Sequence, residues 1–441
     1  MNTAPTIKPR DRDTILSALR AGVVPRIGLQ HIQVGRQREL EALIQDVDRI
    51  AQGGASLRFV IGDYGAGKTF FLFLIRQIAL QRKLVVVQAD LSPDRRIHAT
   101  GGQARNLYAE LAKSLSTRTS PDGGALKNIL ESFVQKTSER AKADGTAIET
   151  AIHAALEDIR EMVCGYDFAT VVAAYARGYE NGDDAIQNAA LRWLRGEYST
   201  KTEARGDLGV RTIIGDDGLY DGLKLLARFA RIAGFGGLLV CLDELVNIYK
   251  LQSSRARQQN YEQILRILND VLQGMTEGIG FALSGTPEFL FDTRRGVFSY
   301  DALQSRLAGN SFAVNGLADF SGPVIRLNNL TPEELYHLVE RLRHVQAGGV
   351  KERYLIPDEA LVAFMEHCGK RIGDAYFRTP RNTVKAFLDL LAVLQQNPGS
   401  DWQPLLGAVE VAADAGATGD LMTDVGEDDP DDELVGLDLG G

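Results

Sequence analysis

Five short apolar runs rich in β-branched residues punctuate the chain, and stretches with helical spacing separate them. They are LRFVIG, KLVVVQADL, GLLVCLDE, GIGFALSG and PVIRLNNL, beginning at residues 57, 83, 237, 278 and 323. Continuous apolar runs are typical of strands that are buried on both faces, as in a parallel sheet covered by helices. The pattern therefore predicts an α/β fold with a five-stranded parallel sheet sandwiched by helices.

Helical spacing also divides the chain into regions. Two helices are expected in residues 1–50, and the core follows in 51–330. Residues 92–236 separate the second and third strands, far more than a crossover requires, and amphipathic stretches predict a helical insertion over about 105–230. Thr331 is suited to cap a helix that begins with Pro332 and Glu333, so 331–397 is predicted to be a helical lid. Residues 398–441 resemble a disordered acidic tail.

Composition narrows the class of protein. The 441 residues are 44% hydrophobic and 24% charged, as in ordinary globular proteins. Apolar runs such as LLVCL fall far short of the roughly 20 residues of a membrane span, and the N-terminus is too polar for a signal peptide. We expect a soluble cytoplasmic protein without membrane contact. Cys164, Cys241 and Cys368 lack the spacing of zinc ligands or a disulfide framework, and the six histidines lack metal-ligand spacing.

The negative charge is concentrated at the C-terminal end. The net charge is −9, but twelve acidic residues and no Lys or Arg follow from Asp401 onward, which leaves residues 1–400 at +3. A mildly positive body permits contact with nucleic acid without demanding it, because clustering of charge decides phosphate binding.

One motif carries specific chemistry. Gly62, Gly67, Lys68 and Thr69 fit G-x-x-x-x-G-K-[ST] between a predicted strand and a predicted helix, and these flanks favour a phosphate loop over an accidental Gly-rich turn. Backbone N–H groups would face phosphate oxygens, Lys68 would reach the β- and γ-phosphates and Thr69 would ligate Mg²⁺. The motif predicts ATP and Mg²⁺ as ligands, with the loop completed by Asp63, Tyr64, Gly65, Ala66 and Phe70.

Hydrolysis would need carboxylates near the magnesium ion and the attacking water. The run GLLVCLDE supplies Asp243 as the candidate Mg²⁺ ligand and Glu244 as the candidate that polarises water. A helix N-cap is the alternative for such a pair, although the phosphate loop favours the catalytic interpretation.

Further candidates complete an ATP-hydrolysing site. The run GFALSGTPEFL should lie between the two motif strands, where Ser284 or Thr286 would contact the γ-phosphate or water; we favour Thr286 over a plain turn. Arg306 and Arg381 are candidates for stabilising developing charge. Arg294 and Arg295 compete with Arg306, and a surface ion pair is the alternative for each.

The order of these parts resembles that of AAA+ ATPases, with VGRQREL similar to their nucleotide-sensing box. A closer resemblance, over nearly the whole chain to about residue 397, is to the BrxD-type ATP-binding proteins of bacterial phage-exclusion (BREX) defence. ILSALRAGVVPRIGLQHIQVGRQREL, FVIGDYGAGKTFFLFLIR and ADLSPDRRIHATGGQARNLY carry it. The resemblance implies Val34, Gly35 and Arg36 near adenine, Arg306 acting on a neighbouring copy, Arg381 as a lid sensor, and a helicase partner from the same system.

Two outputs remain open. A DNA-linked ATPase would use basic side chains in YKLQSSRARQQN and SPDRRIHATGGQARN, although a solvated basic face explains either stretch as well. These candidates are Lys250, Arg255, Arg257, Arg95, Arg96 and Arg105. A nucleotide-gated switch would instead act through protein contacts of the insertion and of the tail, whose DDELVGLDLGG is either a docking motif or a solubilising end.

Overall fold

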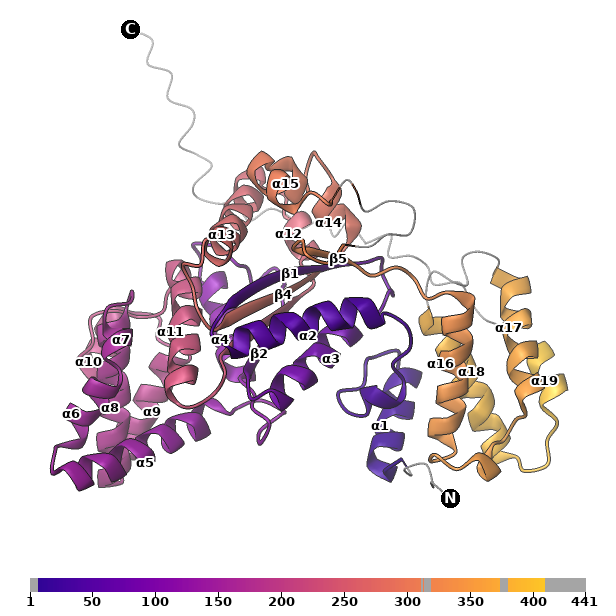
Figure 1. The fold of residues 1–441 in the computed structure, drawn as a ribbon, viewed down its shortest axis with the longest axis horizontal. Helices are drawn as coiled ribbons and strands as arrows, with labels where there is room; N and C mark the ends of the chain where they lie inside the picture. The colour runs from indigo at the N-terminus through magenta and orange to yellow at the C-terminus, as the bar shows by residue number, and fades with distance from the viewer. Residues whose placement is uncertain (1–6, 311, 313–318, 373–379, 409–441) are drawn as a thin grey trace, which may run out of the picture.

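The computed structural model describes residues 7–310, 312, 319–372 and 380–408. The elements form an extended arrangement with the sheet in the middle, the helices of residues 126–208 at one end and the helices after residue 331 at the other (Figure 1).

A five-stranded parallel sheet forms the centre, as predicted. All four strand pairs are parallel and the order is β2-β3-β4-β1-β5. The strands are β1 (Ala55–Ile61), β2 (Val85–Asp90), β3 (Leu238–Asp243), β4 (Ile279–Gly285) and β5 (Val324–Arg326). The strand formed by GIGFALSG, β4, therefore lies between the two motif strands, as expected. Their carboxyl ends meet at one edge of the sheet, where ligands bind in open α/β sheets.

Helices cover both faces of the sheet. One face packs on α2 (Gln37–Ala51) and α3 (Lys68–Gln81), and the other on α4 (Gln103–Ser114), α11 (Leu219–Ile232) and α13 (Ser254–Leu272). Alternate strand residues explain this division. Val60 and Cys241 belong to the first apolar cluster, whereas Phe59 and Val240 belong to the second. Every strand residue from Leu57 to Ile61 is buried, as the continuous apolar run requires.

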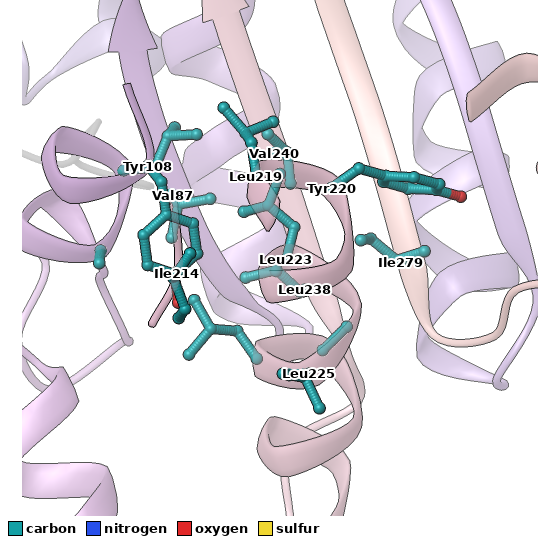
Figure 2. Packing of buried hydrophobic residues seen from close by; sticks show 14 of the residues in the cluster. Val87, Tyr108, Ile214, Leu219, Tyr220, Leu223, Leu225, Leu238, Val240 and Ile279 are labelled. Atoms are coloured by element: carbon teal, nitrogen blue, oxygen red, sulfur yellow. The ribbon is translucent and has the colours of Figure 1, made fainter. Parts of the chain in front are cut away.

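Tyr108 joins the sheet face to the helices beyond it. Its ring packs among Val87, Ile214 and neighbouring apolar residues (Figure 2). A Cβ at Gly222 of α11 would lie 2.7 Å from the ring, so only glycine admits this approach. The buried Tyr108 hydroxyl donates to Leu194 O at 3.1 Å, which ties α4 to the inserted helices.

Helices fill the stretch between β2 and β3, as predicted. Between α4 and α11 these are α5 (Leu126–Asp144), α6 (Ile148–Ala155), α7 (Glu157–Arg160), α8 (Gly165–Asn181), α9 (Asp184–Leu194) and α10 (Lys201–Leu208). Asp216 accepts hydrogen bonds from the backbone N–H groups of Gly102 and Arg105, at 2.6 and 2.8 Å, and so caps α4 from a distant loop. The inserted helices share one apolar core with the sheet.

A third apolar cluster, called here the C-terminal cluster, holds the helices α16 (Pro332–Gln346), α17 (Asp358–Ile372) and α18 (Pro380–Gln396). Thr331 caps α16 in a capping box with Glu334, as the sequence predicts for its start. The first helix, α1 (Pro9–Arg20), also packs in this cluster through the buried Ile15, whereas α2 packs on the sheet. The residues grouped as 1–50 are thus divided between two cores.

The predicted tail region includes a helix. Residues 402–408 form α19 (Trp402–Ala408), where Leu406 is buried and Trp402 and Leu405 pack against the C-terminal cluster. These three side chains share one helix face, so burying them outweighs the polar composition around them. The prediction of disorder from 398 was therefore wrong for this helix, and residues 409–441 lie outside the described part. None of the helices in the described ranges combines the length and hydrophobicity of a membrane span.

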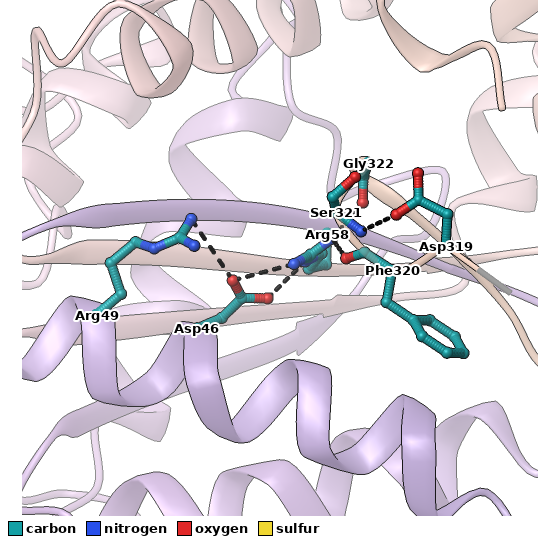
Figure 3. A network of polar contacts seen from close by, with 7 residues as sticks. All are labelled: Asp46, Arg49, Arg58, Asp319, Phe320, Ser321 and Gly322. Atoms are coloured by element: carbon teal, nitrogen blue, oxygen red, sulfur yellow. Dashed lines mark hydrogen bonds and ion pairs between the residues drawn. The ribbon is translucent and has the colours of Figure 1, made fainter. Parts of the chain in front are cut away.

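A buried ion pair connects α2, β1 and the segment before β5. Arg58 donates to both carboxylate oxygens of Asp46, at 2.5 and 3.2 Å, and also to Phe320 O and Gly322 O (Figure 3). Asp46 and Arg58 retain only 3% and 7% of their exposed surface. The guanidinium therefore holds the approach to β5 against the sheet.

Candidate functional site

A cavity of about 290 Å³ opens where the carboxyl edge of the sheet, the start of α3 and the C-terminal helices meet. Its walls come from several separate parts of the chain, and they include most of the residues predicted to bind nucleotide. The lining residues are Leu19, Gly22, Val23, Val24, Ile32, Gln33, Val34, Gly35, Arg36, Tyr64–Phe71, Leu74, Glu244, Leu330, Leu338, Pro380, Arg381 and Val384.

The phosphate loop turns back over the end of β1 before α3 begins. Gly65 and Gly67 adopt φ angles of 78° and 81°, which favour glycine, and Gly67 is the N-cap of α3. Within this structure the Lys68 ammonium donates to Gly62 O and Asp63 O, both at 2.9 Å. The lysine thus spans the mouth of its own loop, with the helix N-terminus beside it.

The two motif strands meet at Thr69 and Asp243. The Thr69 hydroxyl donates to Asp243 Oδ2 at 2.7 Å, and Asp243 Oδ1 accepts from the Glu244 backbone N–H at 2.8 Å. Glu244 has a φ of 59°, which is strained for a residue with a side chain. Asp243 belongs to the strand, whereas Glu244 lines the cavity that Lys68 lines.

The carboxylates and Lys68 influence one another. Removal of water by the surrounding protein raises the pKa of Glu244 even though its side chain is exposed at the cavity, and the charge of Asp243 raises it further. The pKa of Asp90, which pairs with Asp243 in the sheet register, is raised for the same two reasons. Burial lowers the pKa of Lys68, and the nearby Asp243 and Glu244 oppose that effect.

The other half of the cavity is apolar. Val34 and Phe70 pack against the C-terminal cluster, where Leu330, Leu338 and Val384 complete the wall. A flat, apolar nucleobase suits such a surface, and polar atoms at its rim would fix its orientation. The predicted residues Val34 and Phe70 therefore lie where a base would be held.

Arg36 lines the cavity, and its side chain bonds to backbone oxygens of the phosphate loop and of the segment after β5. Its Nη2 donates to Ala66 O of the phosphate loop at 2.5 Å and to Asn328 O at 3.0 Å. Burial lowers the pKa of Arg36, and Glu334 and Glu39 oppose that effect. Arg36 is the N-cap residue of α2 and has a φ of 55°, so its backbone is strained.

Arg381 reaches the cavity from the start of α18. It donates from Nε to Gly22 O at 2.8 Å, with a second bond from Nη2 to the same oxygen, and from Nη1 to the Tyr64 hydroxyl at 3.2 Å. Tyr64 is 50% exposed. One arginine thus joins the C-terminal helices, the end of α1 and the phosphate loop at the cavity.

Three sensor and finger candidates lie outside the residues that line the cavity. Thr286 caps α14 (Pro287–Phe291), accepting from the Phe289 N–H at 3.4 Å. Ser284 is fully buried, and its hydroxyl has no hydrogen-bond partner among the described residues. Arg306 lies on α15 (Asp301–Leu307) and donates to Asn269 Oδ1 at 2.8 Å and Ala302 O at 2.7 Å. The structure therefore brings Lys68, Thr69, Asp243, Glu244 and Arg381 together, but not these three.

Arg295, which competes with Arg306, and Arg257, a candidate nucleic-acid contact, both bond to backbone carbonyl groups. Arg295 donates to Tyr249 O and Leu251 O, both at 2.8 Å, and Arg257 donates to Leu251 O at 2.6 Å. Both guanidinium groups thus organise the loop after α12 (Val246–Tyr249). A role for Arg257 in holding this loop was not foreseen from the sequence.

The other basic candidates are near the protein surface. Arg95 lies 3.9 Å from Glu110, and Arg96 donates to Pro93 O at 2.9 Å. Lys250 and Arg255 are exposed, and Arg105 contributes its backbone N–H to Asp216. None of these five residues lines the cavity.

The residues present fit a nucleotide with Mg²⁺. Thr69 and Asp243 offer the hydroxyl and carboxylate oxygens that Mg²⁺ prefers alongside phosphate and water. The glycines, the Lys68 ammonium and the start of α3 suit a polyphosphate, and the apolar wall suits a base.

Sequence reasoning missed several lining residues. Gly22, Gln33 and Leu338 come from segments read only as helices or connections, and folding alone brings them to the cavity.

Comparison with known proteins adds one match. A family model described as BREX system ATP-binding protein BrxC/D matches residues 7–410. No curated protein matches the chain.

Proposed function

Since the chain belongs to the family of BREX system ATP-binding proteins BrxC/D, a family of phage defence, we propose that it hydrolyses ATP with Mg²⁺ in the cavity at the sheet edge. The cavity joins a phosphate loop, two carboxylates and an apolar wall. Binding, hydrolysis and the output of hydrolysis are separate steps of the proposal, and each has its own support.

The meeting of Thr69 and Asp243 at 2.7 Å is the observation that carries the proposal. It places the hydroxyl of the phosphate-loop helix against the carboxylate of the third strand, which is the pair that would hold Mg²⁺. The metal would neutralise charge on the phosphates when bound. Asp243 also orients the next residue, because its other oxygen accepts the Glu244 N–H.

Glu244 is proposed as the residue that orients and deprotonates the attacking water. The backbone is strained at Glu244, directly after the strand that ends with Asp243, and the Glu244 side chain lines the cavity. Its raised pKa makes it a better base than an ordinary carboxylate. Lys68 would bind the β- and γ-phosphates after releasing Gly62 O and Asp63 O.

An AAA+ architecture is the proposed frame for this chemistry. The strand order, the C-terminal helices over the cavity and Arg381 on α18 support it. Arg381 would sense phosphate as part of a lid over residues 331–397. Arg306, which lies away from the cavity of its own chain, would act on the site of a neighbouring copy. Thr286 or the buried Ser284 would be the sensor at the end of β4.

The proposed output is coupling of ATP turnover to DNA or to a helicase partner of the same defence system. Lys250 and Arg255 are exposed close to the catalytic acids in sequence, which supports DNA contact there. The competing output is a nucleotide-gated switch that acts through protein contacts, and the test below separates the two.

The test is the steady-state ATPase rate with and without double- and single-stranded DNA, using Glu244→Gln as the blank. DNA coupling predicts stimulation that weakens when Lys250 and Arg255 are replaced by Ala, while the basal rate is kept. Lys136→Ala, which removes an exposed positive charge on α5, is a control. A basal rate that no DNA changes would refute DNA coupling and leave the protein partner as the output.

A further inference from the structure

Gly35 and Arg36 contact three parts of the molecule whose movements nucleotide binding would have to link. Arg36 donates to Ala66 O in the phosphate loop and to Asn328 O in the β5–α16 connection, defined as residues 327–331. A Cβ at Gly35 would lie 2.0 Å from Oε1 of Glu334, in the first turn of α16. One short segment therefore bridges the loop, the connection and the first C-terminal helix.

A second contact parallels the one from Arg36. Asn329 in the same connection donates from Nδ2 to Asp63 Oδ2 of the phosphate loop at 3.4 Å, at the outer limit of hydrogen bonding. The loop and connection also approach closely, since a Cβ at Gly62 would lie 2.9 Å from Leu327 O. The phosphate loop is thus held against the connection at Gly62, Asp63 and Ala66.

The chemistry of Arg36 suits a bridge better than a base contact. A planar guanidinium can donate to two carbonyl oxygens at fixed angles, whereas a lysine ammonium is a point donor on a flexible stem. Its Nε is buried without a hydrogen-bond partner among the described residues, and its backbone is in the left-handed region. The surrounding residues therefore hold Arg36 in a strained and incompletely bonded conformation. A movement of those residues should change the conformation of Arg36.

The loop it holds must change when phosphate binds. In this structure Lys68 is bonded to Gly62 O and Asp63 O, two of the residues held against the connection. Phosphate oxygens would compete for that ammonium and release both carbonyl groups. The displacement has a direct route to α16, whose capping box uses Thr331 at the end of the connection and Glu334.

We propose that Arg36 is a positioning residue that couples the phosphate loop to the C-terminal helices, so that ATP binding in the loop shifts α16 and α18. The inference rests on the proposed binding of ATP at this cavity. In this proposal Arg36 binds the phosphate loop and the β5–α16 connection, and the apolar wall that includes Val34 and Phe70 binds the base.

The test compares ATP affinity with the response of the C-terminal helices in the full chain. Hydrogen exchange of α16 and α18 is measured with and without Mg²⁺ and a slowly hydrolysed ATP analogue, and affinity is measured by titration. Arg36→Ala should bind the analogue within about tenfold of the wild type, as expected for loss of one charged hydrogen-bond donor. It should lose most of the nucleotide-dependent protection in both helices.

Three further variants sharpen the result. Arg36→Lys should keep affinity but restore little of the protection, because one ammonium does not span both carbonyl groups. Gly35→Ala should weaken the response through Glu334 without removing a donor to the loop. Arg38→Ala removes the same charge two residues away, where the guanidinium lies 5.8 Å from the Phe320 ring, and should behave as wild type.

The outcomes separate the two proposals. A wild type that fails to bind the analogue refutes the proposed function. Wild-type binding without any change in α16 or α18, or an Arg36→Ala variant that binds and retains full protection, overturns the coupling role. If Arg36→Ala loses binding altogether, Gly35→Ala and Asn329→Ala decide the question. Full nucleotide-dependent protection of α16 and α18 in both variants would also overturn the coupling role. Reduced protection with retained affinity would support it.

Discussion

Breaking the buried pair of Asp46 and Arg58 should cost far more stability than replacing both partners. Their side chains are only 5% and 9% exposed, and the shorter of their two contacts is 2.5 Å. Arg58→Met would leave a buried carboxylate whose next cation, Arg49, lies 3.8 Å away and is 60% exposed. Asp46→Leu would leave a buried guanidinium with carbonyl partners but no counter-charge. Loss of one buried partner typically costs 3–5 kcal/mol.

The contacts of this site place both single variants near the lower end of that range. The carbonyl groups of Phe320 and Gly322 still accept from Arg58 in Asp46→Leu, and Arg49 partly neutralises Asp46 in Arg58→Met. We expect a cost of about 3 kcal/mol each, or a fall in Tm of roughly 6 °C in a domain-sized unit. The double variant leaves no buried charge and loses only the two carbonyl bonds, so about 2 kcal/mol is expected.

Thermal and urea unfolding of the four proteins, followed by circular dichroism, gives this coupling as a double-mutant cycle. Lys136→Ala, on α5, is an exposed-charge control with little expected effect. Single variants that each cost under about 1 kcal/mol, or a double variant equal to their sum, would refute the argument from burial. A large coupling that persists at high salt would support it, since buried pairs are screened little.

Three other predictions concern the cavity. Lys68→Ala should weaken ATP binding by about 100-fold, since charged hydrogen bonds to phosphates are lost, and an unchanged titration would contradict the phosphate-loop assignment. Glu244→Gln should raise the Tm near pH 7, because the raised pKa of Glu244 makes its ionised form destabilise the folded protein. The gain should shrink as pH falls through the raised pKa and be gone once pH reaches the ordinary carboxyl range; a gain independent of pH would disagree. Mixing Arg306→Ala with Lys68→Ala subunits should partly restore turnover if Arg306 acts on a neighbour, and a monomeric mass without rescue would exclude that role.

The sheet and its connections could be predicted because each strand is a continuous apolar run bounded by polar residues. LRFVI and LLVCL bury every residue in the observed strands, and the phosphate-loop motif identifies which strand precedes α3. The position of GIGFALSG between the motif strands followed from the motif order and agrees with the observed sheet.

The cavity beyond the motifs depended on contacts that no local pattern encodes. The resemblance implied Arg36 near adenine, but its bonds to Ala66 O and Asn328 O were not predicted. Its partner oxygen at Asn328 is 292 positions away, and periodicity carries no information about such a pairing. Composition also led to the wrong prediction of disorder at α19. Three apolar residues in seven suffice for a helix once a neighbouring core can bury them.

The central claim is that Glu244 drives ATP hydrolysis in a cavity that binds ATP through other residues. The most direct measurement is single-turnover hydrolysis of Mg²⁺-ATP by wild type and Glu244→Gln, with ATP affinity measured on the same preparations and Glu262→Gln as an exposed control. We expect similar affinity for all three and hydrolysis at least about 100-fold slower in Glu244→Gln alone. Tight binding with equal hydrolysis in wild type and Glu244→Gln would contradict it.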